Sequence, residues 1–152
     1  MDERQFVDDL MVALAEAFAE PEDHEHYLGD EPLAYPALGD ARIWIEDHAL
    51  AISGVSRLRA QVKGQHADAF ARFWDFVGSQ AHASRARDDV QLRRLLVIEC
   101  FEGVGWVEDV IEHLGPETRA LLLDAQQFLA GSNDQVGRWA RRRVRPTPRP
   151  RT

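Results

Sequence analysis

The sequence lacks the cysteine pairs of a disulfide-stabilised protein and the long apolar runs of a membrane protein. It contains one cysteine, Cys100, so an intramolecular disulfide is excluded. No stretch approaches the roughly 18 uninterrupted apolar residues of a membrane-spanning helix, and the acidic residues 1–4 are unlike the start of an export signal. The sequence therefore predicts a cytoplasmic protein held together by an apolar core, with Cys100 as a small buried residue.

The motifs of the common catalytic and cofactor sites are missing as well. No HExxH, CxxC, GxSxG, GxGxxG or GxxxxGK[ST] spacing occurs, and His48, His66, His82 and His113 are scattered singly. The nearest approach to a metal site is Glu-Asp-His-Glu-His at residues 22–26, but adjacent side chains in a proline-bounded loop rarely converge on one ion. We expect no catalytic residues, no cofactor and no metal. Metal binding and partner contact are the alternatives to a solvated acidic loop at 22–26.

The charges that are present are distributed unevenly along the chain. The net charge is −8, yet residues 1–48 carry 14 acidic side chains and two arginines, and residues 136–152 carry seven arginines and no acid. An acidic body attracts basic proteins and repels nucleic acid. The sequence therefore favours a protein partner. Nucleic-acid binding or regulation through the arginine-rich tail is the alternative, besides a tail that aids solubility or self-association.

Apolar residues recur at helical spacing along most of the chain, which predicts an all-α fold. We expect a compact bundle of six to seven helices, with HEAT-like stacking of helix pairs as one arrangement, and no strand. The first helix begins at the capping residue Asp2 and ends before a loop of about twenty residues at 21–39. Asp40 is the predicted N-cap of the next helix. Whether residues 41–63 form one helix or two is left open.

The second half of the chain shows stronger helical patterns. The predicted helices cover residues 65–80, 88–102, 106–114, 116–130 and 133–144. The segment 88–102 is apolar on nearly every side, which is typical of a central helix. The residues 1–144 form one predicted domain. The residues 145–152 are predicted to be disordered, because this Arg/Pro tail has no apolar side chain to bury.

Two acidic residues lie on the predicted central helix. Glu99 and Glu102 are three residues apart and share one side of it, and paired carboxylates can perform acid–base chemistry. Helical bundles that bind two metals need Glu-x-x-His repeats, which are missing here. The alternative is structural, namely a cap on a neighbouring helix or an ion pair with Arg57, Arg59 or Arg72. We expect Glu99 to be largely buried and hydrogen-bonded.

Four segments have a familiar order. They are residues 33–40 leading into the Trp44 helix, 70–76, 95–103 and 114–119. With their aromatic-Gly-Asp segment, Phe-rich helix and Gly-Pro-x-Thr turn, they resemble a family of small all-helical bacterial domains of unknown function, often suspected to be toxin-immunity proteins. The resemblance covers about residues 33–130. It implies a non-enzymatic protein that binds a toxin, and it brings no catalytic residues.

The surface expected to meet such a partner lies within residues 20–48. Binding residues gather on loops presented by a rigid scaffold, and aromatic anchors dominate interface energies. The predicted contact residues are Asp23, Glu25, Tyr27, Tyr35, Asp40, Glu46 and Asp47. The alternative is that these acids only keep the protein in solution.

Overall fold

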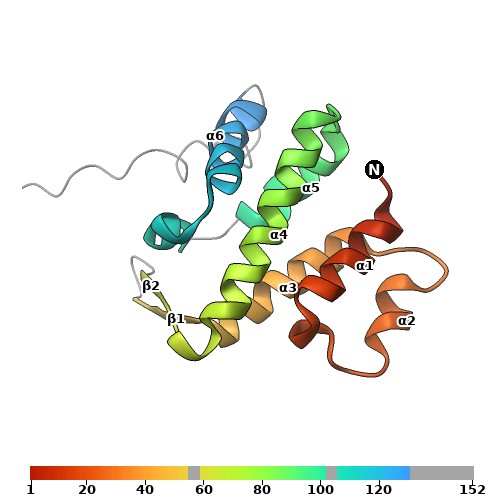
Figure 1. Ribbon diagram of the computed structural model, residues 1–152, viewed down its shortest axis with the longest axis horizontal. Helices are drawn as coiled ribbons and strands as arrows, with labels where there is room; N and C mark the ends of the chain where they lie inside the picture. The colour runs from red at the N-terminus through yellow and green to blue at the C-terminus, as the bar shows by residue number, and fades with distance from the viewer. Residues whose placement is uncertain (55–58, 102–105, 131–152) are drawn as a thin grey trace, which may run out of the picture.

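The computed structural model describes residues 1–54, 59–101 and 106–130, and most of these residues are helical (Figure 1). Within these described residues, three short helices are of the 3-10 type and are labelled η. The order of elements is α1 (Glu3–Ala13), η1 (Ala15–Phe18), α2 (Asp23–Leu28), α3 (Ala34–His48), β1 (Leu50–Ser53), β2 (Arg59–Val62), η2 (Gly64–His66), α4 (Ala67–Ala86), α5 (Val90–Phe101), η3 (Val107–His113) and α6 (Pro116–Ala130). The predicted all-α class is confirmed, apart from a small two-stranded sheet.

Some predictions fall on residues outside this description. They are the helix at 133–144, the tail at 145–152 and the carboxylate of Glu102. Among the helices that the structure describes, none is long and apolar enough to cross a membrane.

The first helix begins as its sequence predicts. The Asp2 carboxylate accepts a hydrogen bond of 3.0 Å from the backbone N–H of Gln5, which satisfies one of the free N–H groups of the first turn. The helix buries Phe6, Val7 and Leu10 on one side. It ends at Ala13 and the chain then tightens into η1, so the predicted apolar stripe continues on a 3-10 turn.

The predicted twenty-residue loop at 21–39 is wrong. α2 lies within it, and α3 already begins at Ala34. Pro36 is the third residue of α3, where its missing N–H costs nothing because first-turn N–H groups have no intrahelical acceptor. Asp40 consequently lies inside α3 and does not cap it. Its carboxylate accepts a hydrogen bond from the Tyr27 hydroxyl, which fastens α2 to α3.

The predicted helical continuation through 41–63 is also wrong, as is the prediction that the chain has no strand. α3 ends at His48, and β1 and β2 form an antiparallel hairpin that pairs Leu50 with Val62 and Ser53 with Arg59. Burial alternates with period two along β2, where Ala60 is buried and Val62 is half-buried between the exposed Arg59 and Gln61. In β1 only Leu50 is buried, and Ile52, which pairs with Ala60, is exposed. Gly54 follows β1 with φ 102°, a conformation that favours glycine.

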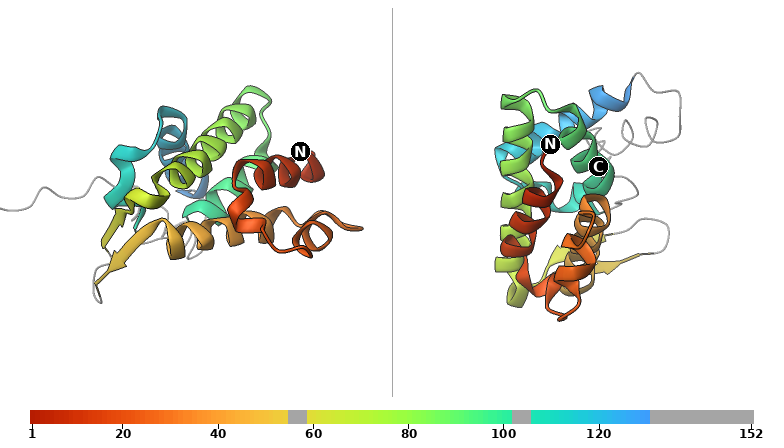
Figure 2. Two further views of the ribbon diagram at one scale, coloured as in Figure 1. Left: turned by 60° about the horizontal axis from the view of Figure 1, so that its bottom comes forward. Right: turned by 90° about the vertical axis from the view of Figure 1, so that its right-hand side faces the viewer.

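The core is divided between two layers of contacts. α3 packs against α1 and α5, whereas α4 packs against α5 and α6 (Figures 1 and 2). An aromatic cluster fills the second layer: the Trp74 ring stacks on Phe101 at 6.1 Å and meets the ring of Trp106 edge-on at 5.9 Å. The helix α5 is shared by both layers, as expected for the central helix. It buries Leu92, Leu95, Leu96, Val97, Cys100 and Phe101.

The predicted burial of Cys100 is confirmed. The residue is fully buried, and burial raises the pKa of its thiol far above the ordinary value. Because the thiolate is the reactive form, Cys100 serves as a packing residue.

Candidate partner-binding surface

The two arginines of residues 1–48 both donate hydrogen bonds to the backbone of other segments. Arg4 donates hydrogen bonds of 2.6 and 2.8 Å to the carbonyl oxygens of Leu28 and Gly29, and so ties the end of α2 to α1. Arg42 donates a 2.7 Å bond from Nε to the carbonyl oxygen of Glu99 on α5. Each guanidinium therefore bonds to backbone carbonyl oxygens of another segment.

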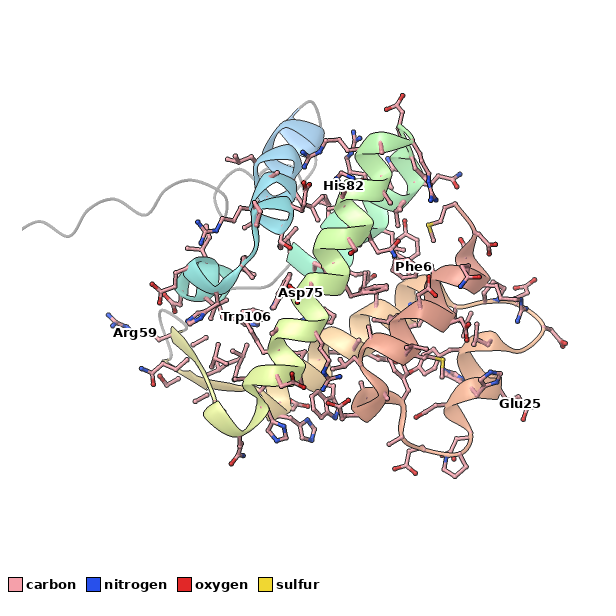
Figure 3. All side chains as sticks on the ribbon, in the orientation of Figure 1. Phe6, Glu25, Arg59, Asp75, His82 and Trp106 are labelled. Atoms are coloured by element: carbon pink, nitrogen blue, oxygen red, sulfur yellow. The ribbon has the colours of Figure 1, made fainter. Side chains whose placement is uncertain are left out.

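The acids of α2 and α3 mostly face solvent. Glu25, Asp40 and Asp47 are exposed, and Glu25 lies at the outer margin of the molecule, on the side away from the hairpin residue Arg59 (Figure 3). Asp23 is half-buried, and its carboxylate accepts a 2.9 Å bond from the N–H of Glu20. Four of the predicted contact residues thus carry negative charge at or near the surface, while Asp23 also fixes the turn that precedes α2.

The predicted aromatic anchors differ in accessibility. Tyr27 is only 7% exposed and its hydroxyl is bound to Asp40. Burial, helped by that carboxylate, raises the pKa of Tyr27 above its ordinary value. Tyr35 is 36% exposed and Ile43 is 44% exposed on α3. Apolar contact area on this helix therefore comes from Tyr35 and Ile43, whereas Tyr27 positions Asp40.

Glu46 lies at a junction between α3 and the second layer. Its half-buried carboxylate pairs with Arg42 and accepts a 2.9 Å hydrogen bond from the indole N–H of Trp106. The Arg42 pair lies within α3, whereas the bond from Trp106 holds α3 against a residue that follows α5. The structure therefore places this predicted contact residue in the internal bonding of the fold, beside the exposed surface.

Glu99 is half-buried and faces α3. A Cβ atom added to Gly39 would lie 2.6 Å from Oε2 of Glu99, so the close approach of this carboxylate depends on glycine at that position. Arg42 donates to the backbone carbonyl of Glu99. Of the three arginines considered from the sequence, Arg57 lies outside the described residues. Arg72 instead pairs with Glu16 and Asp68.

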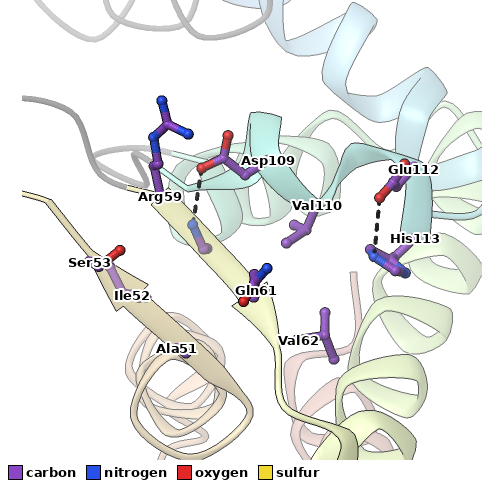
Figure 4. Close-up of a pocket in the computed structure, with 11 residues that line it drawn as sticks. Ala51, Ile52, Ser53, Arg59, Gln61, Val62, Asp109, Val110, Glu112 and His113 are labelled. Carbon is purple, nitrogen blue, oxygen red and sulfur yellow. Dashed lines mark hydrogen bonds and ion pairs between the residues drawn. The ribbon is translucent and has the colours of Figure 1, made fainter.

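The structure also shows a cleft that the sequence did not predict. It has a volume of about 860 Å³ and lies between the hairpin and η3 (Figure 4). The two acidic side chains that line it already have partners. The Asp109 carboxylate accepts a 3.0 Å bond from the Ala60 N–H, and Oε1 of Glu112 lies 3.6 Å from Nε2 of His113. Arg59 also lines the cleft. The two strands beside it have four residues each, too few to give a clear period in the sequence.

The histidine–acid segment at 22–26 does not gather around a common point. His24 lines a small hollow with Asp8 on α1, whereas the ring of His26 packs edge-on against Tyr27 at 4.6 Å. Within residues 1–54, 59–101 and 106–130, no three His, Cys, Asp or Glu side chains are placed to share a metal ion.

The chain was compared with known proteins by sequence and by structure. No family model, curated protein or solved structure matches the chain. We define the α2–α3 surface as the exposed side chains Glu25, Tyr35, Asp40, Ile43 and Asp47.

Proposed function

We propose that this chain is a non-enzymatic binding protein of the immunity type, which neutralises a bacterial toxin by covering a basic region of it with the α2–α3 surface. The orientation of the two arginines carries the proposal. Arg4 and Arg42 bond to backbone carbonyls, whereas Glu25, Asp40 and Asp47 face solvent. A surface of one sign speeds association with an oppositely charged partner and disfavours partners of like charge.

The mixture of side chains on α3 also suits a protein interface. Asp40, Ile43 and Asp47 follow one another at spacings of three and four residues, so they share the outward side of the helix. Interfaces combine an apolar centre with a polar rim, and Ile43 lies between the two carboxylates. The helix is supported by α1 and α5, so binding orders little additional backbone.

Co-expression in bacteria tests the proposal. The chain is expressed with any toxin-like protein encoded next to its own gene, and survival is compared for the wild type and the triple variant Glu25→Gln, Asp40→Asn, Asp47→Asn. Asn at position 40 keeps an oxygen that can accept from Tyr27. We expect the wild type to protect and the triple variant to lose protection, with an unchanged melting temperature.

A matched control removes three exposed acids that lie outside α2 and α3, Asp75→Asn, Asp88→Asn and Glu112→Gln. It changes the net charge equally and should retain protection. Equal loss in both variants would reduce the effect to net charge. Full protection by the triple variant, or no protection by the wild type, would overturn the proposal.

A further inference from the structure

The hairpin brings two histidines together that are eighteen positions apart in the sequence. His48 is the last residue of α3, immediately before the hairpin, and His66 is the last residue of η2, immediately after it. The hydrogen bonding extends beyond the strands, because the N–H of Lys63 donates a 2.8 Å bond to the carbonyl of Ala49. The two imidazole rings consequently lie 6.3 Å apart, centre to centre, at the base of the hairpin.

The ring of His48 is held in a defined orientation. Its Nδ1 lies 3.0 Å from the carbonyl oxygen of Trp44, which can only accept a hydrogen bond. In the neutral ring the proton is therefore on Nδ1, and Nε2 has a free lone pair. A histidine that donates its second N–H to a backbone carbonyl is the usual arrangement for a metal ligand. The Trp44 ring stacks on His48 at 4.5 Å and 11°, and meets His66 edge-on at 5.7 Å.

We propose that His48 and His66 are the two protein ligands of a divalent transition-metal site that clasps the base of the hairpin, with water in the remaining positions. With Zn–N bonds of about 2.0–2.1 Å, two imidazoles on one tetrahedral ion have ring centres roughly 5 Å apart. Metal binding would therefore bring the two rings closer by side-chain rotation; His48 is exposed and His66 is half-buried. Imidazole ligands select zinc, nickel or copper and not magnesium or calcium.

The charges around the pair favour a cation. His48 lies at the C-terminal end of the fifteen-residue α3, where the unpaired carbonyl groups carry partial negative charge. The carboxylate of Glu16 also interacts electrostatically with His66, although Arg72 bonds to that carboxylate and offsets part of its charge. By contrast, His24 and His26 are two positions apart on α2, so their side chains project in different directions.

Titration of zinc chloride into the full chain tests the site by calorimetry, with thermal melting recorded in parallel. A ligand that binds only the folded state raises the melting temperature, so we expect both a binding isotherm and a stabilisation. His48→Gln and His66→Gln should each weaken zinc affinity by at least about tenfold, the loss that even an outer-shell substitution produces. His82→Gln, His113→Gln and the double variant His24→Gln, His26→Gln are the controls and should bind as the wild type does.

The zinc-induced shifts of the histidine ring signals in the NMR spectrum of the wild type provide a reading that needs no variant to fold. His48 and His66 should respond first. Absence of zinc binding by the wild type would overturn the proposal. So would loss of binding in the His24, His26 double variant, or first shifts at His82 or His113.

Discussion

Residues 1–48 and residues 67–125 differ in where their charged side chains lie and in what those side chains bond to. In the first region the two arginines are bound to backbone carbonyls and to Glu46, and most carboxylates face solvent. In the second region acidic and basic side chains both lie at the surface and pair with each other. Arg85, for example, lies 3.5 Å from the carboxylate of Glu117. The surface charge of a region therefore depends on which of its charged groups the fold uses internally.

The two regions also differ in how they pack. α3 buries the small residues Ala34, Ala37 and Ala41, so α1 and α5 can approach it closely, whereas α4 and its neighbours bury Trp74 and Trp106. Large aromatic side chains remove more apolar area from water than alanines do. We therefore expect stability to depend most on the second region and binding to depend most on the first.

The largest effect should come from the aromatic cluster. Trp74→Ala removes a ring that is 2% exposed and contacts Phe73, Phe101 and Trp106, and it should cost about 3–5 kcal/mol in the free energy of unfolding, measured with urea. Val12→Ala, at a position 77% exposed, should change it by no more than about 0.5 kcal/mol. Similar costs for the two would remove the contrast between core and surface.

The internal role of arginine in the first region predicts a smaller effect. Arg42→Gln loses the bond to the Glu99 carbonyl and the ion pair with Glu46. It should destabilise by about 1–3 kcal/mol, because half-buried acceptors lose their donor. Arg94→Gln, at an exposed position of α5, is the matched substitution and should be close to neutral. Equal melting temperatures for the two variants would contradict the structural role of Arg42.

The contact between α3 and α5 can be tested because the effect of Gly39→Ala on stability should change sign when Glu99 is removed. Gly39→Ala should destabilise by about 1 kcal/mol, because the new Cβ displaces the Glu99 carboxylate. In a Glu99→Ala background the same substitution should stabilise by about 0.5–1 kcal/mol, the ordinary gain of alanine over glycine in a helix. A double-mutant cycle measures both values, and additive effects would show that the two residues are not in contact.

The smallest effect concerns the exposed pair of Glu16 and Arg72, which links η1 to α4. The hydrogen bond from Arg72 lowers the pKa of Glu16 below its ordinary value. A lowered pKa in the folded state stabilises the protein above the ordinary pKa, and this stabilisation is lost as the pH falls through the lowered one. The difference in urea midpoint between wild type and Glu16→Gln should thus be small at neutral pH and vanish in acid. A difference that grew in acid would contradict the pairing.

Features with local causes were predicted well from the sequence. The Asp2 cap of α1, the start of α6 at Pro116 and the apolar all-round character of α5 depend on neighbouring residues only. The start of α3 was missed because Pro36 suggests a loop, although a first turn accepts it. The hairpin was missed because its four-residue strands are too short to show a clear period.

The site depends more on tertiary contacts and was predicted less completely. The exposure of Glu25 and Asp47 follows from their charge, but the burial of Tyr27 depends on α2 packing against α3. The internal bonding of Glu46 requires Trp106, sixty residues away. Likewise, nothing near His48 in the sequence indicates His66, because the hairpin between them creates the contact.

The association rate of the purified chain with the toxin proposed as its partner, measured as ionic strength rises, tests the central claim most directly. For the wild type we predict a rate that falls steeply with salt, because screening removes long-range attraction. The Glu25→Gln, Asp40→Asn, Asp47→Asn variant should associate slowly at low salt and depend weakly on it. The Asp75→Asn, Asp88→Asn, Glu112→Gln control should retain most of the wild-type rate and its salt dependence. Identical salt dependence in wild type and triple variant would contradict binding through the α2–α3 surface.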